Sequence, residues 1–332
     1  MDNRRKQLIT LLSQKDNQYI SGQVLSNELQ ISRSAVWKHM KELEKDGYII
    51  EAVTRKGYRI VKHPDKISGN TLQWGLETNW LGQSLTFEEQ TESTQTIAHQ
   101  LAQQGAIHGS VVVADEQLEG RGRLNRPWHS EKGSGIWMSM ILRPEIQPHK
   151  APQLTLLTAV AIVETLKKVC KIEPKIKWPN DIFIHDRKLA GILTEMQAET
   201  DQIQYVIIGL GLNVNHRSDD LPEALQNIAS SIHIETGKQW PRAHIIQRFL
   251  VELEGLYEHF IQHGFAKIKE MWLANAYKIG EQITVHTRNK AWEGILLGIQ
   301  DDGALRVEEV ENKEQHILYS AEIEWHKRRD EE

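Results

Sequence analysis

Three arginines and two glycines fall close together in the run DEQLEGRGRLNRPWH, residues 115–129. The run has no apolar periodicity, so it predicts a loop. Its glycines allow the backbone to approach a ligand closely, and Arg121, Arg123 and Arg126 could surround phosphate oxygens. Such a loop could close over a reactive acyl phosphate. A disordered basic loop that binds nothing in particular has the same composition, so both interpretations stay open.

A second polar cluster ends an apolar strand at KIKWPND, residues 175–181. The run after it, IFIHDRKLAGIL, predicts a hairpin that turns at Asp186–Arg187 and returns through Lys188 and Gly191. Pro, Asn and Asp are also ordinary turn formers, and a lysine here could be a solvated residue at a sheet edge. Each motif taken alone is weak evidence for a ligand site.

The elements that must position these residues lie between about Thr71 and Asn275, where short apolar runs alternate with helical patterns. VVVA at 111–114 and YVIIGLGLNVN at 205–215 predict buried strands, and residues 151–169 predict an apolar helix. The pattern indicates a sheet covered by helices.

The last part of the chain has a period of two in ITVHT, GILLGI and ALRVEEV, with a turn at Asp301-Asp302-Gly303. It predicts a small barrel of about five short strands. A polar stretch that opens at Pro64 predicts a linker. We therefore expect three domains, at residues 1–63, 64–275 and 276–332.

The first part of the chain predicts two short helices, with Ser21 and Ser32 as N-caps and Gly47 as a C-terminal stop. A strand-like hairpin with a basic tip follows, which completes a winged helix-turn-helix pattern. A dimerisation or protein-binding winged helix is the alternative to DNA binding. The side chains expected to face DNA are Ser34, Trp37, Lys38 and Lys41 on the second helix and Arg55 and Lys56 on the hairpin tip.

The charge distribution favours a polyanion partner for this first part only. Residues 1–62 hold 12 Lys and Arg against 7 Asp and Glu, whereas the whole chain of 332 residues has a formal net charge of −5. The single cysteine, Cys170, fits a reducing compartment. No signal-peptide pattern and no apolar run long enough to cross a bilayer is present, so we expect a cytoplasmic protein without a membrane partner.

GRGR, KWPND, RKLAGIL and GLGLNVN occur in this order, and together they resemble the biotin protein ligases. The resemblance covers essentially the whole chain, and its flanking parts resemble the bifunctional bacterial subgroup, which also represses biotin-synthesis genes. The implied fold is an α+β multidomain protein. It would have an N-terminal winged helix-turn-helix, a central mixed sheet with helices like class II aminoacyl-tRNA synthetases, and a C-terminal SH3-like β-barrel.

The resemblance also implies roles for individual residues. The positions matching the family's biotin site are Ser93, Thr94, Gln117, Gly120, Arg121, Arg123, Lys188 and Gly191. The positions matching its nucleotide site are Trp128, Asn180 and Asn213. The implied catalytic group is Arg121, Arg123, Lys188 and Asp181.

The implied reaction activates biotin with ATP to biotinyl-5′-AMP and transfers it to a lysine of the biotin carboxyl carrier domain of acetyl-CoA carboxylase. Mg²⁺ is expected with ATP, and no metal ligands are assigned because no dedicated carboxylate cage is visible. The adenylate would also act as corepressor, favouring a homodimer that binds operator DNA.

The loop departs from the family pattern, because Glu119 replaces an alanine, Leu124 an arginine and Asn125 a glycine. These changes keep open a non-catalytic transcription factor that senses biotin. A ligase for lipoate or another carboxylic acid is also open, because such enzymes resemble this catalytic fold. A nucleic-acid-processing protein is a third alternative, opposed by the net negative charge of the later parts.

Overall fold

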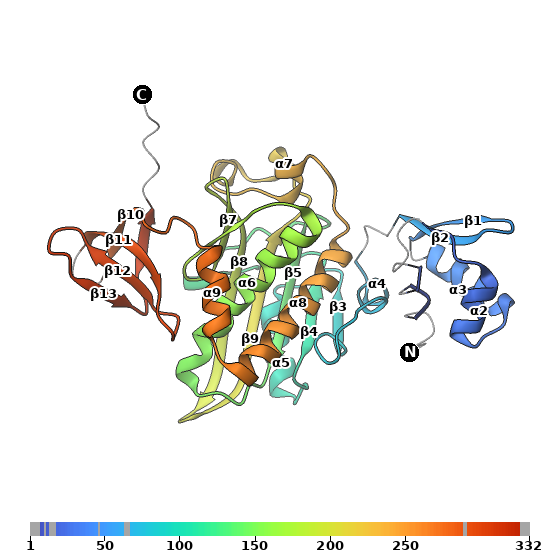
Figure 1. Cartoon of the computed structure of the whole chain (residues 1–332), viewed down its shortest axis with the longest axis horizontal. Coiled ribbons are helices and arrows are strands. Elements are labelled where there is room, and N and C mark those ends of the chain that lie inside the picture. The colour runs from blue at the N-terminus through green and yellow to red at the C-terminus, as the bar shows by residue number, and fades with distance from the viewer. Residues whose placement is uncertain are drawn as a thin grey trace.

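The computed structural model describes residues 7–9, 11–12, 18–45, 47–62, 67–287 and 291–325. In Figure 1 the winged-helix part lies at one end of the molecule and the C-terminal sheet at the other, with the largest part between them. The start of the predicted linker, at Pro64, lies outside the described residues.

The N-terminal part contains α2 (Gly22–Leu29), α3 (Arg33–Lys45) and the antiparallel hairpin of β1 (Ile49–Val53) and β2 (Gly57–Lys62). Ser21 caps α2 by accepting a hydrogen bond from the backbone of Val24, as predicted. Val36, Met40 and Leu43 are the buried residues of α3, and Trp74 joins their cluster from the central part. The predicted winged helix-turn-helix arrangement is therefore present.

The central part is built on a seven-stranded sheet in the order β3-β4-β5-β9-β8-β7-β6. Only the pairing of β3 with β4 is parallel, which makes the sheet mixed, as expected. The strands are β3 (Leu85–Glu88), β4 (Ser110–Ala114), β5 (Gly135–Leu142), β6 (Lys175–Lys177), β7 (Asp181–Ile184), β8 (Arg187–Glu199) and β9 (Gln202–Asn213).

Helices cover both faces of this sheet. The helices are α4 (Gly69–Gln73), α5 (Thr94–Gln103), α6 (Ala151–Cys170), α7 (Ile232–Thr236), α8 (Arg242–His263) and α9 (Ala266–Ala274). Short 3₁₀ turns occur at Arg123–Asn125, Pro148–Lys150, Ser218–Asp220 and Glu223–Leu225. None of the described helices is long and apolar enough to span a membrane.

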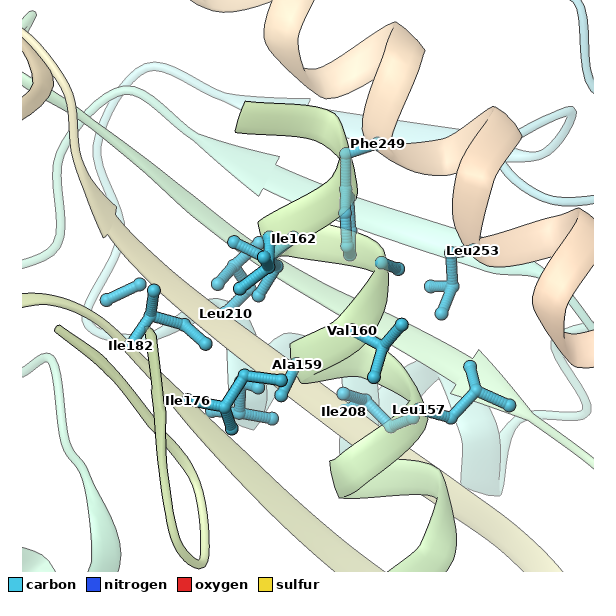
Figure 2. Packing of buried hydrophobic residues seen from close by; sticks show 14 of the residues in the cluster. Leu157, Ala159, Val160, Ile162, Ile176, Ile182, Ile208, Leu210, Phe249 and Leu253 are labelled. Carbon is cyan, nitrogen blue, oxygen red and sulfur yellow. The ribbon is translucent and has the colours of Figure 1, made fainter. Parts of the chain in front are cut away.

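The alternation of side chains along the strands separates two surfaces of the sheet. On one face, Ile208 and Leu210 of β9 pack with α6 and α8, as Figure 2 shows. On the other face, Ile207 of β9 packs with Ala98 and Ala102 of α5. Because α5 is short, it covers only part of its face, and the polar residues described below lie there.

The C-terminal part is a five-stranded antiparallel sheet in the order β13-β12-β11-β10-β14. Its strands are β10 (Gln282–His286), β11 (Ala291–Ile299), β12 (Leu305–Glu309), β13 (Gln315–Leu318) and β14 (Glu322–Trp325). The predicted number of strands and the turn at 301–303 are confirmed. Among the described residues β13 does not pair with β14, so the sheet has two edges and the predicted barrel is not closed.

Candidate functional site

Glycines form the floor of a site on the α5 face of the sheet. Gly191 of β8 is paired directly with Gly211 of β9, and the indole of Trp128 lies against both. A Cβ atom added at Gly211 would meet the indole at 2.5 Å, and one added at Gly191 would meet it at 3.0 Å. Only glycine permits so close an approach, which explains the glycines inside these two strands.

Trp128 has a polar atom that the contacts within the described residues do not satisfy. Its indole nitrogen is buried and has no hydrogen-bond partner among the described residues. The Nζ atom of Lys188 lies 5.2 Å from the centre of one ring, in cation–π geometry. A buried donor without an acceptor costs free energy, so the indole N–H of Trp128 is a candidate donor to a ligand.

Two cations converge beside this floor. Lys188 Nζ lies 2.8 Å from a carboxylate oxygen of Asp181, because the β7–β8 hairpin brings the two residues side by side. Arg123, on the Gly-Arg loop (residues 115–129), donates to the side-chain oxygen of Asn180 at 3.2 Å. Asn180 is fixed in turn by donating to the carbonyl of Ile192 at 2.8 Å. The arrangement can hold two negatively charged groups close together.

A cluster of neutral polar groups lies at the start of α5. Ser93 is the N-cap of this helix, and Thr94 donates through its backbone N–H to the side-chain oxygen of Gln117 at 2.8 Å. Gln117 donates to the hydroxyl of Ser130 at 2.9 Å. Gly120 packs so closely that an added Cβ would lie 2.6 Å from that hydroxyl. These groups suit an uncharged ligand with several donors and acceptors.

The other predicted residues of the site lie farther along the loops. Arg121 reaches Glu195 of β8 at 3.4 Å. Asn213, at the end of β9, is buried and donates to the carbonyl of Ser230 at 3.0 Å. In the winged helix, all four predicted residues of α3 and both residues of the wing tip are exposed: Ser34, Trp37, Lys38, Lys41, Arg55 and Lys56.

Sequence reasoning missed three polar residues beneath the loop, Gln95, Ser139 and Glu195. Burial raises the pKa of Glu195, but hydrogen bonds from Gln95 and His99 and the charge of Arg121 outweigh burial, so the net pKa is lowered. A sequence signal existed, because Gln95 lies inside TESTQ and Glu195 follows Gly191 by four residues, which puts it on the same face of β8.

Lys177 of β6 was also missed. Its Nζ atom lies 4.4 Å from the centre of the Phe183 ring and 5.5 Å from that of Trp325, on β14 of the C-terminal sheet. Burial lowers the pKa of Lys177, and the charge of Asp181 opposes this effect. The lysine thus lies where the central and C-terminal parts meet, next to the pair of Asp181 and Lys188.

Three family models match the chain in the order of its parts. A model described as HTH domain matches residues 4–59, the Biotin/lipoate A/B protein ligase family matches 87–213, and the Biotin protein ligase C terminal domain matches 278–325. The chain is 49% identical over 320 residues to the bifunctional ligase/repressor BirA of Bacillus spizizenii, covering 96% of this chain and 98% of that protein. The chain belongs to the bifunctional biotin protein ligases.

Other members of the family agree with this assignment. The bifunctional ligase/repressor BirA of Escherichia coli is 30% identical over 303 residues, covering 91% of each chain. The structure of a biotin protein ligase from Aquifex aeolicus in complex with biotin and ATP superimposes with a TM-score of 0.63 at 26% identity. That match covers 73% of this chain and 97% of the other. The resemblance noted from the sequence motifs is confirmed.

Proposed function

We propose that this protein binds biotin and ATP over the glycine floor, forms biotinyl-5′-AMP, and transfers the biotinyl group to a lysine of a biotin carboxyl carrier domain of acetyl-CoA carboxylase. The observation that carries the proposal is the meeting of a cluster of neutral polar groups with a pair of cations, Lys188 and Arg123. Biotin has a neutral ring system at one end and a carboxylate at the other. Both ends therefore find matching groups.

The neutral end would lie against the cluster of polar groups at the start of α5. The residues assigned to biotin are Ser93, Thr94, Gln117, Gly120, Arg121, Arg123, Lys188 and Gly191. Ser93, Thr94 and Gln117 would offer hydroxyl and amide groups to the ureido ring. The carboxylate would then point toward Lys188.

The first chemical step joins two anions, and the catalytic group of Arg121, Arg123, Lys188 and Asp181 would offset their repulsion. A carboxylate oxygen of biotin attacks the α-phosphorus of ATP, and the bond to pyrophosphate breaks. Lys188 and Arg123 would stabilise the charge on the phosphoryl oxygens, and Asp181 would hold Lys188 in place. Closure of the loop would exclude the water that hydrolyses the mixed anhydride.

The second step consumes the adenylate. The amine of the acceptor lysine, after losing its proton, attacks the acyl carbon of biotinyl-5′-AMP and AMP leaves. The nucleotide would contact Trp128, Asn180 and Asn213. The indole N–H of Trp128, which has no partner in the part of the chain that the structure describes, would be one donor. We leave the proton acceptor unassigned between Asp181 and Lys188.

Mg²⁺ would enter with the phosphates of ATP. It usually binds through phosphates, waters and one or two carboxylates, and Asp181 is a carboxylate that fits this part of the site. Within the described residues, the one group of three close metal-binding side chains is Glu309, Glu314 and His316, in the C-terminal sheet. We therefore assign no dedicated metal cage to the reaction.

The repressor activity would use the winged helix. The exposed face of α3 would read the major groove of operator DNA, and Arg55 and Lys56 would contact phosphates. We further propose that the adenylate-bound protein is a homodimer, which presents two winged helices to a two-fold operator. We propose three domains, at residues 1–63, 64–275 and 276–332, of which the last would be an SH3-like barrel. The protein would act in the cytoplasm.

Pyrophosphate release tests the enzymatic part. The purified protein is incubated with ATP, Mg²⁺ and either biotin or lipoate. Release of pyrophosphate with biotin but not with lipoate supports the proposal. Release with lipoate would favour a lipoate-type ligase, and tight binding of biotin without release would favour a non-catalytic sensor.

A further inference from the structure

A chain of hydrogen bonds connects Thr94, at the start of α5, with Arg121. The hydroxyl of Thr94 lies 2.8 Å from that of Ser139, and Ser139 donates to the side-chain oxygen of Gln95 at 2.9 Å. Gln95 donates to Glu195 at 2.9 Å. The same carboxylate oxygen of Glu195 lies 2.9 Å from His99 Nε2 and 3.4 Å from Arg121.

Most side chains of this hydrogen-bond chain are shielded from water. Ser139 has 0% of its surface exposed, and Thr94 and Gln95 have 3% each. Gly209 makes the room for it, because a Cβ there would lie 2.6 Å from the side-chain oxygen of Gln95. Hydrogen bonds in such surroundings are stronger than in water, and an unmade one is costly.

The carboxylate of Glu195 determines which group donates and which accepts in each of these hydrogen bonds. An ionised carboxylate only accepts, so Gln95 must turn its NH₂ group to Glu195 and its oxygen to Ser139. Ser139 therefore donates its one hydroxyl proton to Gln95, so toward Thr94 it can only accept. The single hydroxyl proton of Thr94 is then shared between the hydroxyl of Ser139 at 2.8 Å and the side-chain oxygen of Gln117 at 3.1 Å. Thr94 donates in either case, which leaves a lone pair for an N–H donor of a ligand.

We propose that Gln95 and Glu195 are positioning residues of the ligase, which act on two other residues. Through the chain, they orient the hydroxyl of Thr94 to accept from the N–H of a cyclic urea. At the surface, Glu195 also holds Arg121 and with it the Gly-Arg loop over the bound adenylate. The inference rests on the proposed function, because it assumes that biotin binds beside Thr94 at the start of α5.

The two roles can be separated with three variants of the full-length protein. Glu195→Gln keeps the shape of the side chain but removes the fixed acceptor and the charge. The exchange variant Gln95→Glu/Glu195→Gln returns a carboxylate to the chain, so Ser139 again donates and Thr94 again accepts, but Arg121 still lacks an anionic partner. Glu199→Gln is the matched control, since Glu199 lies on the same strand, is exposed and accepts only from Gln204 in the described hydrogen bonds.

Biotin affinity is measured by calorimetry, and the dissociation rate of preformed adenylate by rapid mixing, with circular dichroism to confirm folding. Glu195→Gln should weaken biotin binding about tenfold, as expected for one hydrogen bond to a charged group, and should speed adenylate release by a similar factor. The exchange variant should recover biotin affinity but still release adenylate quickly. Glu199→Gln should match the unchanged protein in both measurements.

Wild-type biotin affinity in a folded Glu195→Gln protein would overturn the inference. So would an exchange variant that folds and binds biotin as weakly as Glu195→Gln. If instead the unchanged protein fails to bind biotin, the proposed function itself is wrong.

Discussion

At the scale of single residues, the site depends on charges held close together by short-range geometry. Lys188 lies 2.8 Å from Asp181 because a tight hairpin joins their strands. Arg123 reaches the same region from the loop, through Asn180. Each cation is held by a protein partner, and in the proposed reaction such preorganisation would stabilise the transition state.

Replacement of Lys188 should therefore slow adenylation strongly. We expect Lys188→Gln to lower kcat for pyrophosphate release by about 10²- to 10³-fold, the usual effect of removing one charge-stabilising donor. Lys175→Gln is the control, because Lys175 is an exposed lysine of β6. Equal rates for the two variants would contradict the role given to Lys188.

His216 predicts an acid-dependent loss of stability. Its ring is fully buried, and burial lowers its pKa to about 4, helped by His129 and Arg242 and opposed by Asp220. The unfolded chain gains this proton near pH 6.5 but the folded protein does not, so stability falls as the pH falls from about 6.5 to about 4. Between pH 7 and pH 5 the loss from this group is about 2 kcal/mol.

Urea unfolding of the protein and of His216→Leu at pH 7 and pH 5 measures this contribution. The variant should lose about 2 kcal/mol less than the unchanged protein over this interval. His263→Leu, which changes an exposed histidine, should behave like the unchanged protein. An identical loss in all three proteins would show that His216 titrates normally.

At the scale of elements, the alternation of side chains along β8 and β9 determines which residues face the candidate site. It directs apolar side chains toward α6 and α8 and leaves Gly191, Gly209 and Gly211 on the opposite face. Glycine normally weakens a strand, so its use at three neighbouring positions marks a place where something must lie against the backbone. Trp128 and Gln95 take that room in the described structure.

Gly211→Ala tests this close approach. The added methyl group would meet the indole of Trp128 at 2.5 Å, so we expect the Michaelis constants for biotin and ATP to rise at least about tenfold. Gly255→Ala is the control, because nothing lies within 4 Å of a Cβ at this position in α8, where alanine favours the helix. Unchanged kinetics in Gly211→Ala would show that the indole is free to move aside.

The elements themselves were largely predictable, and the contacts between them were not. Hydrophobic period and turn residues predicted the β7–β8 hairpin and the winged helix, because both depend on residues near in sequence. Glu195 was missed because its partners Gln95 and Arg121 lie 100 and 74 positions away. Lys177 was missed for the same reason, since Trp325 belongs to another part of the chain. The roles of the predicted site residues came from the family resemblance and stay predictions.

At the scale of the whole molecule, the winged-helix part lies at one end and the central part lies between it and the C-terminal sheet (Figure 1). We propose that the first part binds DNA and that the central part binds the ligands. The adenylate would link them, because an ordered Gly-Arg loop changes the surface available for self-association. Acceptor protein consumes the adenylate and would thereby relieve repression. Ligation and DNA binding are then alternative outcomes of the same intermediate.

The wing should contribute a phosphate contact. We expect Arg55→Asn to weaken binding to all DNA sequences alike and to reduce the slope of log K against log salt by about 0.9. Asparagine tolerates the left-handed backbone of this residue, which has φ 67°. Lys313→Asn, at φ 61° in the C-terminal sheet, removes an equal charge and should leave the slope unchanged. An unaltered slope in Arg55→Asn would remove this residue from the DNA interface.

The most direct test of the central claim is the mass of a biotin carboxyl carrier domain after incubation with this protein, biotin, ATP and Mg²⁺. We predict that the domain gains one biotinyl group on a single lysine, and that replacing this lysine by arginine abolishes the gain. A carrier domain that keeps its original mass, while the protein binds biotin, would contradict the account.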